Sequence, residues 1–317
     1  ELGPQPPRTS RTRGRADFRR PMSEVSQRHL AKIMLINAIW GFNLVAIKAG
    51  VDRFPPVFSG FLRFLVVALV VLPWLRVRRG EMRWLLIAAI FGGGLQFAIM
   101  YTGVALSGNM SSVAIAGQLG IPFAAILSVV VLGERIHWRR SLGIALSFAG
   151  VVVLGFNPEV IKSWRGLALI VLGAFIGAIG LVAIKRVRDL NALELQAWLS
   201  WGSLPVLLLL SFWLESGQID SLRNIDLAGA GAVLYSALLA SLFAHTAYFA
   251  LVHRYPVSRV APLTVLAPVF SVGFAILFLG DVLEWRMVIG GVMTLTGVAV
   301  IVMREGKAAG TGSLGPT

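Results

Sequence analysis

The sequence contains no cysteine and few charged residues. Asp, Glu, Lys and Arg make up only 14% of the 317 residues, and Cys is absent. The absence of cysteine excludes disulfides, thiolate nucleophiles and zinc sites built on thiolates. A soluble domain has about a quarter charged residues, so the low charge indicates a surface that mostly faces hydrocarbon. The sequence has no metal-binding motif or phosphate-binding loop, and we expect no metal and no cofactor.

Hydrophobic residues are abundant and gather in long runs. They make up 56% of the chain, and the mean hydropathy is +0.78. A helix that rises 1.5 Å per residue needs about 20 apolar residues to cross the hydrocarbon of a bilayer. Ten runs meet this requirement, which predicts an all-α integral membrane protein with ten transmembrane helices. The predicted spans are 31–50, 57–75, 84–105, 110–132, 139–156, 166–185, 192–214, 229–252, 257–279 and 285–303.

Basic residues are distributed unevenly between the predicted loops. If the N-terminus is cytoplasmic, 22 of the 29 Lys and Arg residues lie in inner segments and five in outer loops. Because short cytoplasmic loops retain Lys and Arg, both termini are expected to be cytoplasmic, in a multi-pass protein of the cell (inner) membrane. The net charge of +14 therefore indicates topology, and no nucleic-acid partner is expected. The strongest inner signal is Arg76, Arg78, Arg79 and Arg83.

The runs divide the chain into two halves and three connecting or terminal segments. Residues 1–30 are rich in Pro and Arg and have no apolar core, which predicts a disordered basic arm rather than a signal peptide. Met22 is a candidate for the true start. Residues 31–156 form a first five-helix repeat, 157–165 an outer linker and 166–303 a second repeat. Residues 304–317 are expected to be a disordered tail.

The evidence for duplication is an internal match at an offset of 147. Thirteen of the 43 positions from 111 to 153 are identical to those 147 residues later, including Gly133 with Gly280 and Trp138 with Trp285. A second match, at an offset of 137, pairs residues 44–48 with 181–185, both reading Leu-Val-Ala-Ile-Lys. Because five is an odd number, the second repeat enters the membrane inverted, and inverted repeats favour transport by alternating access. Duplication that only built a stable bundle is the alternative.

Several local motifs resemble those of one transporter family. They are Trp-Gly-Phe-Asn at 40–43 with Lys48, Pro55-Pro56 with Leu-Arg-Phe at 62–64, Leu-Gly-Glu-Arg at 132–135, and Arg-Val-Ala-Pro-Leu at 259–263 with Pro268. Over residues 31–303 the chain resembles EamA-type exporters of the drug/metabolite transporter superfamily. The resemblance implies two five-helix repeats and export of amino acids, metabolites or drugs. A multidrug or nucleotide-sugar-like carrier of the same fold is the alternative, because one fold serves many substrates.

No carboxylate lies in the predicted hydrocarbon core, so a proton relay would need another group. His245 is the titratable candidate deep in the eighth span, and it shares a helix face with Ser241. The alternative for His245 is a histidine that only bonds a neighbouring helix. An enzyme built on Ser241 and His245 is disfavoured, because no orienting carboxylate lies near them, and a channel or receptor has no need for inverted halves.

Other polar and aromatic residues near mid-span complete the predicted substrate site. An amide in hydrocarbon needs a hydrogen-bond partner, so Asn43, Gln96 and Gln118 should contact either the substrate or a neighbouring helix. Trp40 and Tyr235 are candidates to line the cavity. Lys48 and Arg63 are predicted gate or structural charges, which could bind a substrate carboxylate or pair with carbonyl groups. Snorkelling to water is favoured for Lys48, and a structural role that also shapes the outer gate is favoured for Arg63. The expected partners are a small-molecule substrate and the lipid bilayer, with a homodimer as a further option.

Overall fold

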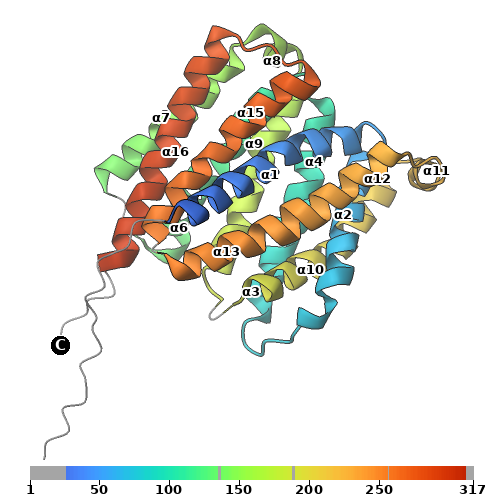
Figure 1. The fold of residues 1–317 in the computed structure, drawn as a ribbon, viewed down its shortest axis with the longest axis horizontal. Helices are drawn as coiled ribbons and strands as arrows, with labels where there is room; N and C mark the ends of the chain where they lie inside the picture. The colour runs from blue at the N-terminus through green and yellow to red at the C-terminus, as the bar shows by residue number, and fades with distance from the viewer. Residues whose placement is uncertain (1–25, 135–136, 188–189, 256, 312–317) are drawn as a thin grey trace, which may run out of the picture.

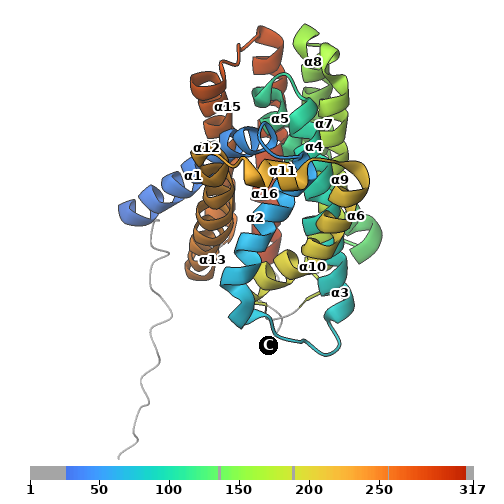
Figure 2. The ribbon, with the colours of Figure 1, turned by 90° about the vertical axis from the view of Figure 1, so that its right-hand side faces the viewer.

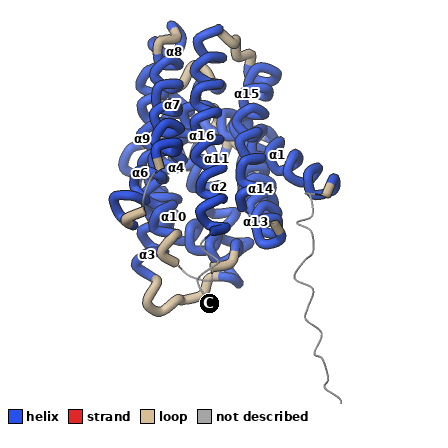
Figure 3. Tube along the Cα trace, turned by 90° about the vertical axis from the view of Figure 1, so that its left-hand side faces the viewer, coloured by secondary structure: helices blue, strands red, loops and turns tan. Residues whose placement is uncertain are grey.

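The computed structural model describes residues 26–134, 137–187, 190–255 and 257–311, which are helices joined by loops and turns, with no strand (Figures 1 and 3). Ten helical segments of this part of the chain are long and apolar enough to cross a membrane, which confirms the predicted fold class. We number them one to ten in chain order. Their bounds are Gln27–Val51, Pro56–Trp74, Met82–Leu106, Met110–Leu132, Trp138–Gly155, Trp164–Ile184, Ala192–Leu214, Leu227–Val252, Pro262–Leu279 and Trp285–Met303.

Five spans are continuous α-helices and five contain a change of helix type. The continuous ones are α1 (Gln27–Val51), α7 (Trp138–Gly155), α9 (Trp164–Ile184), α10 (Ala192–Leu214) and α16 (Trp285–Thr311). The others are α2 (Pro56–Val71) with η1 (Leu72–Trp74), α3 (Met82–Ile87) with η2 (Ala88–Leu95) and α4 (Gln96–Leu106), α5 (Met110–Ala116) with η3 (Gly117–Leu119) and α6 (Gly120–Leu132), α12 (Leu227–Leu234) with η4 (Tyr235–Ala244) and α13 (His245–Arg254), and η5 (Ala261–Val265) with α15 (Leu266–Leu279). Three short helices, α8 (Pro158–Lys162), α11 (Gln218–Arg223) and α14 (Val257–Val260), lie between spans.

The changes of helix type recur at the offset of the sequence repeat. The π-helical segments η2 and η4 begin at Ala88 and Tyr235, which are 147 residues apart. Spans four and nine both contain a 3₁₀ segment, η3 and η5, and both end at a glycine with positive φ, Gly133 and Gly280, also 147 apart. The positive φ explains the glycine at both positions, because a Cβ is strained there. The duplication therefore extends from the sequence to the backbone.

The halves pack against each other through corresponding pairs of helices. Helix α1 packs on α15 and on span eight, and its counterpart α9 packs on α6 and on span three. The corresponding spans two and seven, α2 and α10, pack on each other, as do spans five and ten, α7 and α16. Figure 1 shows α7 beside α16, and α1 between α15 and the helices of span eight. Exchanging the two halves leaves this pattern of contacts unchanged.

The contact between α7 and α16 is made by small residues. A methyl group at Gly150 would lie 2.5 Å from the carbonyl oxygen of Gly290, and one at Gly297 would lie 2.4 Å from that of Gly143. The side chains of Ser147 and Thr294 each lie 3.4 Å from the other's carbonyl oxygen. Residues of increasing number along α7 contact residues of decreasing number along α16, so these two corresponding helices run antiparallel. Small residues allow this approach of two backbones within lipid.

The helix ends differ from the predicted terminal segments. Helix α1 begins at Gln27, inside the arm predicted over residues 1–30, whose first 25 residues, with Met22, lie outside the described part. Helix α16 continues to Thr311, beyond residue 304 where a disordered tail was predicted. Residues 304–309 contain Arg, Glu, Lys and two Ala, which favour helix, together with one Gly and no proline. The predicted linker 157–165 contains α8, which begins with Pro158 at the first helical position.

The bundle has two ends. Figures 2 and 3 show α8 at one end and the loop before α3 at the other, and we call these the α8 end and the α3 end. Because successive spans cross in alternate directions, the segment with α11 lies at the α8 end, with the loops 52–55 and 280–284.

Candidate functional site

The π-helical segment of span eight exposes backbone carbonyl groups to side chains of other spans. A π-turn widens the helix and shifts its hydrogen-bond pattern, and such segments are frequent at functional sites. The carbonyl oxygen of Ala240 accepts hydrogen bonds from Trp40 Nε1 at 3.2 Å and His245 Nδ1 at 2.8 Å. The carbonyl oxygen of Ser241 accepts one from Gln196 Nε2 at 3.0 Å. Spans one, seven and eight therefore meet around this segment.

Arg63 of α2 is buried beside the same segment, with 5% of its surface exposed. Its Nε donates to Ser241 Oγ at 3.0 Å, its Nη1 lies 3.4 Å from the Tyr101 hydroxyl, and its guanidinium lies 5.1 Å from the centre of the Phe97 ring. These partners are all uncharged, and Arg63 forms no ion pair with a described carboxylate. A buried charge that lacks an opposite charge costs roughly 3–5 kcal/mol. Arg63 does not reach water in this conformation.

Aromatic rings form a wall on one side of the segment. The Trp40 ring makes edge contacts with the rings of His245, at 5.2 Å between centroids, and Tyr248, at 5.6 Å. The Tyr235 hydroxyl donates to the carbonyl oxygen of Ile39 at 3.1 Å, and its ring contacts Phe42. Four of the predicted site residues therefore lie together where α1 meets span eight: Trp40, Tyr235, Ser241 and His245. We call these four residues and Arg63 the central cluster.

Ser241 and His245 are not arranged as a nucleophile and a base. Ser241 Oγ donates to the carbonyl oxygen of Ser236 at 2.9 Å and accepts from Arg63, while His245 Nδ1 faces the Ala240 carbonyl. No hydrogen bond joins the two side chains among the described contacts. An activated serine needs a base within hydrogen-bond reach, so this geometry does not favour nucleophilic catalysis.

The three predicted amides lie in different surroundings. Asn43 Oδ1 is buried on α1 and accepts no hydrogen bond from a described residue. Gln96 packs on span six, because a methyl group at Gly177 would lie 2.2 Å from its Oε1. Gln118 is half-buried in η3 beside the exposed Gly117 and has no hydrogen bond to the central cluster. Gln96 therefore lies against a neighbouring helix, and Asn43 retains an unused acceptor.

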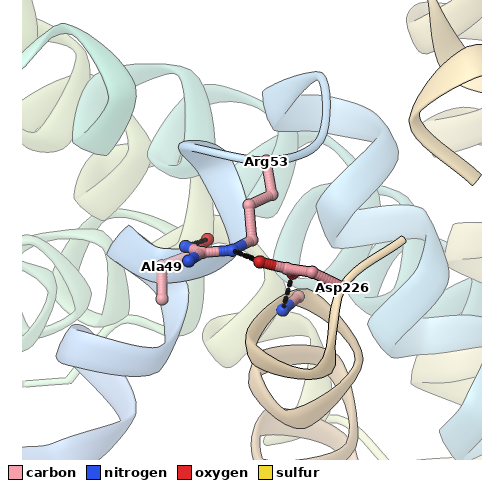
Figure 4. Close-up of polar contacts among 4 residues, drawn as sticks. Ala49, Arg53 and Asp226 are labelled. Atoms are coloured by element: carbon pink, nitrogen blue, oxygen red, sulfur yellow. Dashed lines mark hydrogen bonds and ion pairs between the residues drawn. The ribbon is translucent and has the colours of Figure 1, made fainter. Parts of the chain in front are cut away.

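Charged groups link the two halves at the α8 end. Arg53 Nε donates to both carboxylate oxygens of Asp226, at 3.0 and 2.8 Å, and Arg53 Nη1 donates to the carbonyl oxygen of Ala49 (Figure 4). Asp226 also caps α12 by accepting from the backbone N–H of Gly229. The hydrogen bond from Arg53 is the first cause that holds the pKa of Asp226 below its usual value, and the Gly229 N–H is the second. Lys48 pairs with Asp52 on its own helix.

The α3 end also carries contacts between the halves. Arg78 pairs with the buried carboxylate of Glu194, and Trp198 Nε1 donates to the carbonyl oxygen of Arg76 at 2.9 Å. Lys185 Nζ lies 3.4 Å from Glu134 Oε1. Both ends are therefore held by ion pairs that connect the two halves.

Two hollows of the structure lie away from the central cluster. One of about 340 Å³ at the α8 end is lined by Arg53, Phe54 and Asp226 together with residues of α11 and the following loop. The other, of about 500 Å³, is lined by Leu238, Leu242, Phe243 and other residues of span eight. No predicted site residue lines either one.

Sequence reasoning did not assign three polar residues of the spans to the site, namely Tyr101, Asn37 and Gln196. Tyr101 is 1% exposed and reaches Arg63, although its type is typical of the membrane interface. Asn37 is fully buried and its amide donates to the carbonyl oxygen of Leu263 at 3.1 Å, which joins spans one and nine. Asn37 and Gln196 both lie within predicted spans, so the rule that applied to Gln96 could have found them.

Comparisons with known proteins agree with this architecture. The EamA-like transporter family matches residues 29–156 and 164–303. Over 88% of this chain and 97% of its own length, a "Probable amino-acid metabolite efflux pump" of Escherichia coli (strain K12) is 28% identical. The protein of the same name in Salmonella typhimurium is 29% identical over 84% of this chain and 92% of its own length. A solved crystal structure at 17% identity has the same fold, with a TM-score of 0.58 over 88% of this chain and 98% of that one.

The ten apolar helices and these relatives define a multi-pass membrane transporter. The chain belongs to the EamA-like transporter family, and with it to the drug/metabolite transporter exporters that its motifs resemble.

Proposed function

We propose that this protein is a secondary transporter that exports amino acids or related small metabolites by alternating access. The observation that carries the proposal is the correspondence between the halves, in which equivalent helices pack antiparallel through Gly150 and Gly290. Antiparallel packing of equivalent helices is expected when two five-span repeats enter the membrane in opposite senses. Such halves can exchange conformations, so that a central site opens first to one side and then to the other.

The substrate class and the orientation are supported by different observations. The two relatives named above are named for efflux of amino-acid metabolites. The basic loops, above all Arg76 to Arg83, support a cytoplasmic α3 end in the cell (inner) membrane, with both termini on that side. The central cluster supports a site between the halves, because Arg63 belongs to the first half and Ser241 to the second.

A flux assay tests this function. Purified protein in liposomes is screened for uptake of each of a panel of labelled amino acids, with and without an imposed pH gradient, and empty liposomes serve as the control. We expect saturable uptake of at least one amino acid. Uptake that is the same with and without the pH gradient would identify a facilitator. A full panel with no uptake above empty liposomes, from protein that is monodisperse and folded, contradicts the proposal.

A further inference from the structure

Arg63 is a buried cation without an opposite charge beside it among the described residues, which is the property of a group that binds an anion. Its guanidinium is almost fully buried, its Nε and Nη1 face uncharged hydroxyl groups, and its Nη2 donates to no described residue. The planar fork of arginine matches a carboxylate better than it matches single hydroxyl groups, which leave its charge uncompensated. A substrate carboxylate would supply the missing opposite charge.

The position of Arg63 fits a site used in alternating access. Its contacts Tyr101 and Phe97 belong to span three of the first half, whereas Ser241 belongs to the π-helical segment of the second half. A ligand bound here contacts both halves, as a substrate must if its binding is to be coupled to their relative movement. The unused acceptor Asn43 Oδ1 lies on α1, the helix that brings Trp40 to the same segment.

We propose that Arg63 binds the carboxylate of the transported molecule, with Ser241 and Tyr101 as its positioning partners. The assignment rests on the transport function proposed above and names a substrate class for it, which is small carboxylates such as zwitterionic amino-acid metabolites. Neutral sugars and cationic drugs lack the group that Arg63 recognises.

Competition in proteoliposomes tests the assignment with matched ligands. For each labelled L-amino acid that the wild type takes up, unlabelled acid and the corresponding C-terminal amide compete for uptake. We expect the acid to compete at least about tenfold better, which is typical for loss of a hydrogen bond to a charged group. In R63Q this ratio falls towards one, and in R63K, which keeps the charge but not the fork, it is intermediate. R165Q, which removes an exposed arginine, keeps the wild-type ratio.

The outcomes separate this assignment from the transport function. Uptake by the wild type in which acid and amide compete equally well overturns the role of Arg63 and leaves transport standing. A ratio that survives in both R63Q and R63K also overturns it. Absence of all uptake overturns the transport function and the assignment with it. The ratio of acid to amide competition does not depend on the amount of active protein. If Arg63 had only a structural role, its substitution would therefore lower uptake without changing this ratio.

Discussion

At the residue scale, burial decides which polar side chains need a hydrogen-bond partner. Asn43 Oδ1 and Arg63 Nη2 have no described hydrogen-bond partner, and the Gln96 side chain packs on Gly177 of a neighbouring helix. A polar group left unsatisfied in hydrocarbon is unfavourable, so its persistence needs a reason such as a ligand. The same reasoning explains why Trp40 and His245 both donate hydrogen bonds to the carbonyl oxygen of Ala240.

His245 carries a prediction at this scale. If uptake by the wild type depends on an imposed pH gradient, we expect H245Q to remove that dependence and to retain gradient-independent uptake. The glutamine amide can still donate to the Ala240 carbonyl, as Nδ1 does at 2.8 Å, but it cannot carry a proton through the physiological pH range. Uptake of a labelled amino acid with and without the gradient measures both properties. An unchanged response of H245Q would assign proton coupling to another group.

At the scale of elements, small residues set how closely helices approach. The small residues of α7 pack on those of α16, and the backbones approach most closely at Gly150 and Gly290. We call this contact the joint between spans five and ten. In lipid the hydrophobic effect does not drive helices together, so close packing supplies the attraction.

Substitution of Gly150 tests this joint. A methyl group there would meet Gly290 O and Thr294 at 2.4 to 2.6 Å, so we expect G150A to lower the free energy of unfolding by about 1–3 kcal/mol. G155A is the matched control, because nothing lies within 4 Å of the added methyl on the same helix. Unfolding in mixed micelles measures both variants. An equal free energy of unfolding for G150A and G155A would contradict the expectation, because it would mean that α7 and α16 accommodate the added methyl group without loss of stability.

The ion pair at the start of α12 gives a pH prediction. The pKa of Asp226 is lowered in the folded protein, so its contribution to stability is present above the ordinary carboxyl pKa. That contribution is lost as the pH falls through the lowered pKa. We expect D226N, which keeps the cap on α12, to reduce this acid-induced loss of thermal stability. D226A removes both the ion pair and the cap, so we expect it to lower thermal stability at neutral pH.

The control for this prediction is Asp220 on α11. Its contact with Arg223 of the same short helix is 3.9 Å long and its side chain is 77% exposed. D220N should therefore leave the pH profile of the melting temperature close to that of the wild type. A D226N profile that coincides with that of the wild type would contradict the role of the Arg53 pair.

At the scale of the whole molecule, the proposed inversion requires the two ends to face opposite sides of the membrane. We expect V77C, in the loop before α3, to react with a thiol reagent only from the cytoplasm, and I219C, on α11, only from outside. Both side chains are exposed, at 75% and 61%, and no native cysteine interferes. Labelling of right-side-out and inverted vesicles with an impermeant maleimide provides the measurement. Reaction of both positions from one side would refute the ten-span topology.

The sequence by itself determined the ten spans, because hydrophobic length is a local property that lipid imposes on each helix separately. It also determined the repeat, since Gly133 and Gly280 mark the same backbone turn in both halves. Four of the residues that the sequence predicts for a substrate site lie together where α1 meets span eight: Trp40, Tyr235, Ser241 and His245.

Only the tertiary structure decided which polar groups are satisfied. Nothing in the sequence around Arg63 and Tyr101 shows that their side chains meet, or that Gln96 lies against Gly177. These outcomes depend on how helices distant in sequence rotate and pack, and each such contact joins residues of different spans. The π-helical segments that free the carbonyl groups are likewise set by packing, because Ala88–Leu95 and Tyr235–Ala244 read as ordinary apolar helix.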